Sequence, residues 1–406
     1  MLFALAWRNI WRHPHRTILC VSSITIAAAI TVFLLSFERG AYGTMKENVL
    51  RLMDGFSQVQ ASTFQSDPDL RKTIDNAEPL MRKLASIQGI TAVAPRTVSY
   101  VILNSKNRSY AAALVGIDPA REVQVSTLYS TVVAGRFLKA GDGAQIVIGD
   151  ALARNLHVGV GGTLTLLGTA ADGTVAADVV TVAGIFRTGT PDLDRQTAEM
   201  PLSRFQNDFA IASKVNLIVI AGHSLGAIQN SLQSIQATAK AFGADALDWT
   251  RLEPAVNDII LFGESFWLLI YISLIAIVVF ILLNTILMSL LERHREFGML
   301  MAIGMRPTKL GLLVWVELFF LAVLGTSLGT AIGFAATAWA AAHGIPFPDA
   351  GALFARWHMP ATLYPQIDAV GTFAGPIAIA LSITCAGVIP FSRVMRLSPI
   401  AAMSDQ

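Results

Sequence analysis

The sequence LERHREFGMLMAIGMR, residues 291–306, stands between two long apolar runs and decides how the chain is arranged. It opens with four charged side chains that keep it out of the lipid interior: Glu292, Arg293, Arg295 and Glu296. Apolar side chains then recur at three- and four-residue steps, the spacing of one helix face: Phe297, Leu300, Met301 and Met305. Gly298 and Gly304 add small positions that permit close approach. This chemistry predicts a short amphipathic helix at a membrane face, which either lies on headgroups or docks onto a partner.

Composition points to a membrane protein with a large polar part. Hydrophobic residues make up 53% of the 406 residues, charged residues make up 14%, and the mean hydropathy is +0.55. The apolar residues gather in four runs, at 17–37, 266–291, 310–342 and 369–391. The first run has no charged residue, and as a helix it would cover roughly 31 Å, about the thickness of the hydrocarbon core. It follows a basic flank, as a signal peptide would, but its length and the lack of a cleavage site favour a retained anchor. The sequence therefore predicts four transmembrane helices.

The basic residues of the short flanks predict the orientation. Residues 1–16 carry three arginines and no acid, the segment 292–309 is also basic, and the tail 392–406 carries two arginines. The loop 343–368 carries only Arg356. We therefore expect a multi-pass protein with both termini and 292–309 in the cytoplasm, and with 38–265 and 343–368 outside. Residues 1–16, with Trp7 and Trp11, are expected to form a helix at the cytoplasmic surface of the bilayer.

Residues 38–265 should form a large extracytoplasmic α/β domain. Helical periodicity at 39–53 predicts a continuation of the first span. A first block then reads as strand 57–62, helix 77–87 and strands 93–103 and 109–116. A β-rich block follows, with strands 145–148, 163–167 and 179–185 and a helix at 150–156. The first block resumes as strand 215–220, helix 225–242 and strand 246–251. This order predicts one α/β lobe into which a β-rich lobe is inserted.

Charge and cysteine content exclude several classes of protein. The formal net charge of +2 gives no basic excess of the kind that nucleic-acid binding requires. The two cysteines, Cys20 and Cys385, lie in predicted spans, so the outer domain has no disulfide framework. We expect neither a metal site nor a catalytic set in this chain.

Gly222–Gly226 reads GHSLG, a G-x-S-x-G pattern between a predicted strand and a predicted helix. That context fits a nucleophile elbow, and Ser224 would be the nucleophile of a membrane-anchored esterase. The remaining members of a triad are not supplied, because the later histidines fall in the cytoplasmic segment or in a short outer loop. We interpret Ser224 as a helix N-cap instead.

Polar and small residues inside the predicted spans have two interpretations each. Glu317 is either part of a proton relay or a structural hydrogen-bonding partner of a neighbouring helix. Gly325, Gly329 and Gly333 line one face of the third span, for packing within one subunit or for a contact between subunits. Asn284 in the second span is expected to hydrogen-bond across a helix interface.

Four stretches make the chain resemble a known family. They are AWRNIWRHPHRT (6–17), GRFLKAGDGAQIVIGDALARNLHVGVGGTLTLLG (135–168), LERHREFGMLMAIGMRPTKL (291–310) and RVMRLSPIAAM (393–403). The chain resembles, over its whole length, permease subunits of the MacB/FtsX/LolC-LolE (lipoprotein-release) family of ABC transporters. The resemblance implies a porter-like lobe with a β-rich inserted lobe, placed in the periplasm, and four helices in the inner membrane.

The resemblance also implies partners. Residues 292–309 match the family's coupling helix, which contacts the ATPase, through Glu292, Arg293, Arg295, Glu296, Phe297, Gly298, Leu300, Ala302 and Gly304. No G-x-x-x-x-G-K-[ST] occurs, so ATP and Mg²⁺ are expected to bind a separate ATPase subunit. Two ATPases imply a second permease subunit, of the same or a related chain.

The family leaves the cargo open. Length, the separate ATPase and the stretch NVLRLMDGFSQVQ (48–60) are most similar to the lipoprotein-release members, which favours extraction of lipoproteins or other lipid-anchored cargo. The alternatives are an efflux permease that works with a periplasmic adaptor, and a mechanotransmitting module that controls a cell-wall hydrolase.

Overall fold

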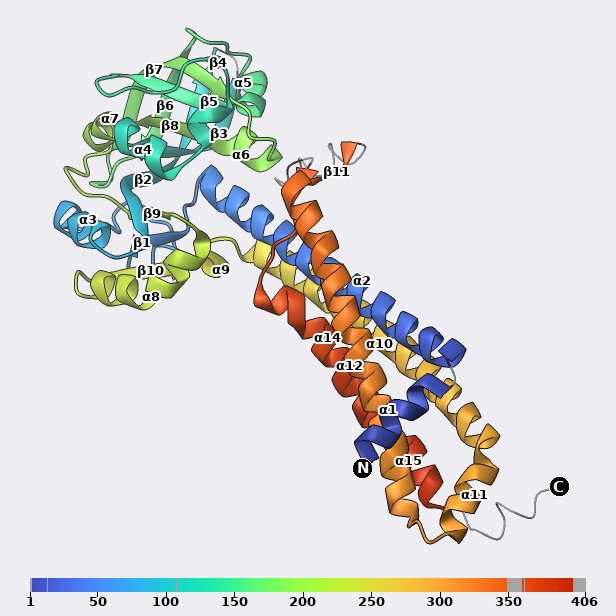
Figure 1. Cartoon of the computed structure of the whole chain (residues 1–406). Helices are drawn as coiled ribbons and strands as arrows, with labels where there is room; N and C mark the ends of the chain where they lie inside the picture. The colour runs from blue at the N-terminus through green and yellow to red at the C-terminus, as the bar shows by residue number, and fades with distance from the viewer. Residues whose placement is uncertain (1, 13, 107, 349–359, 361, 397–406) are drawn as a thin grey trace. The chain divides into compact units, whose positions relative to one another are not determined.

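The computed structural model describes residues 2–12, 14–106, 108–348, 360 and 362–396 (Figure 1). It divides into two units. The helical unit comprises Met1–Gly43, Ile260–Pro348 and Ala361–Gln406, and the sheet unit comprises Thr44–Ile259 and Asp349–Pro360. Two long helices, α2 (Pro14–Leu52) and α10 (Pro254–Glu292), belong to both units.

The helical unit is built from long apolar helices. Besides α2 and α10 it contains α1 (Leu2–Arg12), α11 (His294–Ala302), α12 (Pro307–His343), α14 (Ala369–Ala386) and α15 (Val388–Met395). Four segments are long and apolar enough to cross a membrane: Pro14–Leu52, Pro254–Glu292, Pro307–His343 and Ala369–Met395. The four predicted runs lie within these segments, and the last one is divided at Gly387.

Helix α12 is the most deeply packed of the four. In its most apolar window 61% of the residues are buried, against 11% in α10. After α12 the short strands β11 (Ile345–Pro346) and β12 (Thr362–Leu363) pair antiparallel. Residues 349–359 and 361 of the predicted loop 343–368, and residues 397–406 of the predicted tail, lie outside the described residues.

The sheet unit contains one mixed sheet. Its strands are β1 (Ser57–Ala61), β2 (Ile90–Ser105), β3 (Arg108–Ile117), β4 (Val132–Gly135), β5 (Gln145–Gly149), β6 (Thr163–Thr169), β7 (Val175–Phe186), β8 (Thr197–Pro201), β9 (Leu217–Gly222) and β10 (Ala244–Asp248). Their order is β10-β1-β9-β2-β3-β8-β5-β7-β4, and β6 pairs with β2 and β7. The pairs β3–β8 and β5–β7 are parallel.

Strand β2 joins the two predicted lobes into this single sheet. Its first part, from Ile90 to Arg96, pairs with β9, whereas its second part pairs with β6 at Ile102–Asn104. The β-rich block is therefore continuous with the first block through one long strand. Separate sheets would each leave unpaired edges, and a shared strand removes two of them.

Short helices cover the sheet. Helices α3 (Ala77–Ala85) and α8 (Leu225–Lys240) lie beside each other next to β1, β9 and β10 (Figure 1). The others are α4 (Pro119–Val125), the 3₁₀ turn η1 (Leu128–Thr131), α5 (Asp150–Leu156), α6 (Pro191–Gln196), α7 (Leu202–Asp208) and α9 (Trp249–Leu252). A main apolar core includes Leu103, Leu114, Ile148, Leu166 and Phe205.

One local expectation is wrong, and one strand was not expected. The segment 246–251 was expected to be one strand, but β10 ends at Asp248 and α9 begins at Trp249. Residues 197–201, for which the sequence gives no strand signal, form β8 in the middle of the sheet. All five residues of β8 are buried, so the polar-apolar alternation that marks half-buried strands does not occur there.

Candidate functional site

The segment 291–306 contains a short helix, α11, between two long helices. Figure 1 shows α11 joining the ends of α10 and α12. It ends in a Schellman motif, because Gly304 N donates to Met301 O (3.0 Å) and Met305 N donates to Leu300 O (3.0 Å). Gly304 has a φ of +100°, and a Cβ there would meet open space. Gly304 therefore terminates the helix, and it is not the close-approach position that the sequence suggested.

One face of α11 packs inside the helical unit. Phe297 is fully buried, and Gly298 and Met301 are buried beside it. Phe297 and Met301 join a core that includes Leu290, Leu310 and Val394, so α11 is held by α10, α12 and α15. Leu300 is partly buried against the same core.

The other face is exposed and mixes charge with apolar surface. It carries Arg295, Glu296, Met299 and Ala302, and the flanking residues Glu292 and Ile303 are exposed as well. Met299 is 61% exposed and Ile303 is 79% exposed. The sequence pattern alone does not mark these two residues, although their spacing of four places them on one face of the helix.

Arg293, the residue between α10 and α11, links the segment to the membrane helices. Its Nη1 lies 3.6 Å from Glu317 Oε1, and its Nε lies 3.2 Å from Glu296 Oε2. Its guanidinium also lies over the Phe297 ring, 5.2 Å from the centroid. Asn9 Nδ2 of α1 donates to Glu317 Oε1 at 2.7 Å. Glu317 is thus bound by two side chains from other elements.

The three glycines of α12 face α2 of the same chain. A Cβ at Gly325 would come 2.6 Å from Ile24 Cβ, and one at Gly329 would come 2.6 Å from Ala28 Cβ. A Cβ at Gly333 would come 2.8 Å from Ala29 O. Asn284 lies exposed on α10, and within the described part of the chain its side chain has no hydrogen-bonding partner.

Two family models match this sequence. One, described as FtsX-like permease C-terminal, matches residues 268–399, and one described as MacB-like periplasmic core domain matches residues 17–235, more than half of the chain. The chain belongs to the MacB/FtsX/LolC family of ABC transporter permeases. It is a membrane-embedded permease with a periplasmic-type domain, and membership of this family implies partnership with ABC ATPase subunits.

Individual relatives are distant. The lipoprotein-releasing system transmembrane protein LolC of Neisseria meningitidis is 23% identical over 300 residues, which are 70% of this chain and 72% of that protein. The extracellular domain of the ABC-type transporter YknZ from Gram-positive bacteria is 14% identical, covers 48% of this chain and 100% of that one, and has a TM-score of 0.36. The periplasmic region of MacB from Actinobacillus actinomycetemcomitans is 15% identical, covers 52% and 97%, and has a TM-score of 0.37.

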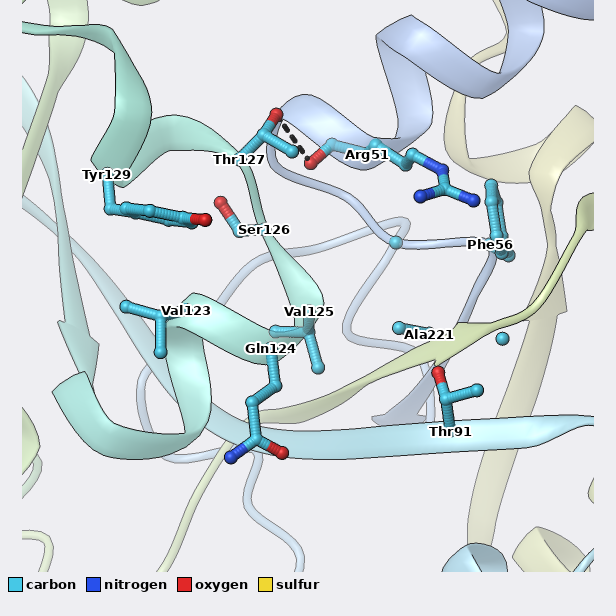
Figure 2. Close-up of a pocket in the computed structure, with 12 residues that line it drawn as sticks. Arg51, Phe56, Thr91, Val123, Gln124, Val125, Ser126, Thr127, Tyr129 and Ala221 are labelled. Atoms are coloured by element: carbon cyan, nitrogen blue, oxygen red, sulfur yellow. Dashed lines mark hydrogen bonds between the residues drawn. The ribbon is translucent and has the colours of Figure 1, made fainter.

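In the sheet unit of the permease, the last turn of α2 is held by the segment between α4 and η1. Thr127 donates to Arg51 O through its backbone N (2.8 Å) and its hydroxyl (3.2 Å), and Ser126 Oγ donates to Leu52 O (2.8 Å). These bonds satisfy carbonyls that a helix end leaves without intrahelical partners. Figure 2 shows the pocket of about 250 Å³ beside this turn, with Thr127 bonded to Arg51.

A buried charge cluster lies nearby in the permease. Arg96 on β2 and Glu122 on α4 are both almost fully buried, and their two hydrogen bonds measure 3.1 and 2.5 Å. Glu199 on β8 is fully buried, and neither of its carboxyl oxygens has a hydrogen-bonding partner in the described part of the chain. Burial, with a contribution from the charge of Glu122, raises the pKa of Glu199 to about 8.

Ser224 of the permease caps α8. Its Oγ accepts a hydrogen bond from Ala227 N at 3.2 Å, which is the N-cap geometry that the sequence analysis favoured. Among the described residues, no group of three or more His, Cys, Asp or Glu side chains could hold a metal ion.

Proposed function

We propose that this permease carries the movement of two partner ABC ATPases through α11 to the sheet unit, which lies on the outer side of the inner membrane. There the movement extracts or exports lipoproteins or other lipid-anchored cargo. Both termini and α11 face the cytoplasm in this proposal. The observation that carries it is the exposed face of α11, in which charged residues flank Met299 and Ile303.

This face suits docking into a protein groove. Exposed apolar side chains that lie next to charges of both signs are typical of protein contacts, whereas a helix lying on headgroups presents a separate basic face. The buried face of α11 is anchored by Phe297 and Met301, and Arg293 is bound to Glu317. A force on α11 therefore acts directly on α10 and α12.

The exposure of α10 supports a second permease subunit. Most of its apolar window is unburied in this chain. Asn284 presents an unpartnered amide on the same helix. A polar side chain at bilayer depth is best satisfied by another helix. A second copy or a related permease would supply that helix.

Two apolar surfaces support a lipid-anchored cargo. A groove of about 600 Å³ lies between α12 and α14, and its walls include Ala331, Phe334 and Phe373. In the sheet unit, five large side chains on neighbouring strands share one exposed face: Tyr100, Ile102, Leu167, Val175 and Val179. Exposed apolar patches of this kind mark interaction sites. The name of the LolC relative points to the same class of cargo.

The test uses the tagged full-length chain, purified from its native membrane in mild detergent, with every retained protein and acylated peptide identified by mass spectrometry. We expect an ABC ATPase, a second permease and acylated lipoprotein. Ile303→Asp should lower ATPase recovery by about tenfold, the effect of losing a central apolar contact. Val133→Asp, at an exposed valine of the sheet unit outside that apolar face, is the control and should leave ATPase recovery unchanged.

The other outcomes separate the alternatives. An adaptor without lipoprotein would favour efflux, and an ATPase with a cell-wall hydrolase and no cargo would favour signalling. Recovery of the wild-type chain without any ATPase would overturn the proposal.

A further inference from the structure

The two long helices that enter the sheet unit meet it at one end of two paired strands. Helix α2 ends at Leu52 shortly before β1, and α10 begins at Pro254 shortly after β10. Strands β1 and β10 are antiparallel neighbours, with Ser57 opposite Asp248. The segments 53–56 and 249–253 therefore leave the sheet at the same end, and both belong to the sheet unit. Each segment carries one acid beside its helix, Asp54 and Glu253.

The side chains of these two acids lie within hydrogen-bonding reach of each other. Two carboxylates can only accept hydrogen bonds, so the contact exists only while one of them holds a proton. On the other side of Asp54, Gln58 Nε2 donates to its carbonyl oxygen (2.9 Å) and to Oδ1 (3.2 Å). The Gln58 amide donates to the oxygens of Asp54, which leaves the carboxyl proton for the bond to Glu253.

The nearby cations are engaged elsewhere, so they do not neutralise the two carboxylates in place of that proton. The charge of Arg96 on β2 acts on Asp54, and Glu122 on α4 and Glu199 on β8 act on Arg96 in turn. The neighbouring helices α2 and α9 carry Lys46, Arg51 and the exposed Arg251. Lys46 lies over the Trp249 ring, Arg51 lies over the Phe56 ring, and Arg96 is bound at two nitrogens by Glu122. Burial raises the pKa of Asp54, and burial together with the charge of Asp54 raises the pKa of Glu253 to about 8.

We propose that Asp54 and Glu253 form a proton-binding site that joins the ends of α2 and α10 in the sheet unit. With the proton bound, one hydrogen bond links Asp54, the second residue after α2, to Glu253, the residue before α10. When the proton leaves, two facing carboxylates repel each other and the two helix ends separate. The consequence rests on the proposed function, because α2 and α10 are the helices that would carry movement to the sheet unit. The site thus makes that transmission depend on the pH of the outer side.

The test is amide hydrogen exchange of the full-length chain in detergent, read by mass spectrometry as protection factors for peptides within 44–58 and 247–260. Protection factors divide out the intrinsic effect of pH on exchange. Between about pH 6 and about pH 10 the wild-type chain should lose protection in both segments by about tenfold or more, since one pKa unit corresponds to a tenfold change in equilibrium.

Glu253→Gln should remove this dependence, because its amide donates to the Asp54 carboxylate without any proton. Asp54→Asn should also remove the pH dependence, because the new amide would donate to the Glu253 carboxylate. The test therefore stands even if one variant fails to fold. Asp258→Asn, which changes an exposed acid in the first turns of α10, is the matched control and should behave like the wild-type chain. A wild-type chain with constant protection, or variants that lose protection as the wild type does, would overturn the proposal. No ATPase or cargo takes part in the measurement, so its failure is distinct from failure of the proposed function.

Discussion

Asn9 on α1 donates a 2.7 Å hydrogen bond to Glu317 Oε1 on α12, and the same oxygen lies 3.6 Å from Arg293 Nη1 at the start of α11. One carboxylate thus ties the N-terminal helix and the proposed coupling helix to a membrane helix. An acid in a predicted span is costly without partners, and these contacts supply them. The arrangement favours the structural interpretation of Glu317 over a proton relay.

Glu317→Ala should destabilise the helical unit, because it leaves the largely buried Arg293 and the amide of Asn9 without their partner. Removal of one member of a buried ion pair costs about 3–5 kcal/mol. Glu317→Gln keeps an oxygen for the Asn9 amide and should cost less. Thermal unfolding of the purified chain in detergent checks both variants. Equal midpoints for Glu317→Ala and the wild-type chain would refute the structural role.

Gly329→Val should disturb the contact between α12 and α2. A Cβ at Gly329 would come 2.6 Å from both Ala28 Cβ and Thr25 O, so the helices must move apart. Overpacking of this kind costs about 1–3 kcal/mol. Ala335→Val, at an exposed position of α12, is the control and should leave the unfolding midpoint unchanged. If both variants unfold at the wild-type temperature, close packing of α12 on α2 does not require the glycine at this position.

Glu199→Gln should reduce the pH dependence of stability. The folded chain holds the Glu199 proton up to about pH 8, whereas its ordinary pKa is 4.5. Between these values the folded state binds more protons than the unfolded state, so stability is full below the ordinary pKa and falls as pH rises towards 8. The amide carries no charge at any pH.

Thermal midpoints at about pH 6 and about pH 9 measure this difference, and 1 kcal/mol moves the midpoint of a domain of this size by roughly 2–4 °C. We expect the wild-type midpoint to fall more than that of Glu199→Gln. Parallel decreases in the two proteins would show that Glu199 does not hold its proton as described.

Ala331→Trp should fill the groove between α12 and α14 and reduce the recovery of acylated cargo by about tenfold, an effect of roughly 1.4 kcal/mol. Ala335→Trp adds the same side chain to α12 outside the residues that line the groove. Quantitative mass spectrometry of co-purified lipoprotein compares the two. Unchanged recovery with Ala331→Trp would place the acyl chains elsewhere.

Long patterns in the sequence predicted the fold well. The apolar runs lie within the four long helices, and the predicted helix 150–156 has the same bounds as α5. The strand β8 was missed because its burial on both faces and its internal Glu199 give no alternation. The continuity of the two lobes through β2 depends on pairing between distant segments, which no local pattern encodes.

The site was only partly predictable. Periodicity correctly grouped Phe297 with Met301, but it does not tell which apolar residues of α11 face the chain itself and which face outward. The exposure of Met299 and Ile303 follows from how α10, α12 and α15 pack around α11. The pairing of β1 with β10 brings the segments that carry Asp54 and Glu253 to one end of the sheet, so their proximity becomes visible only in three dimensions.

The proposed function requires that α11 docks onto an ABC ATPase. The most direct measurement is photo-crosslinking in native membranes, with a photoreactive amino acid in place of Met299 and, as a control, in place of the buried Met301. We predict a covalent product with an ATPase subunit from position 299 and none from position 301. Absence of an ATPase product from position 299, in a chain that is folded and inserted, would contradict the account.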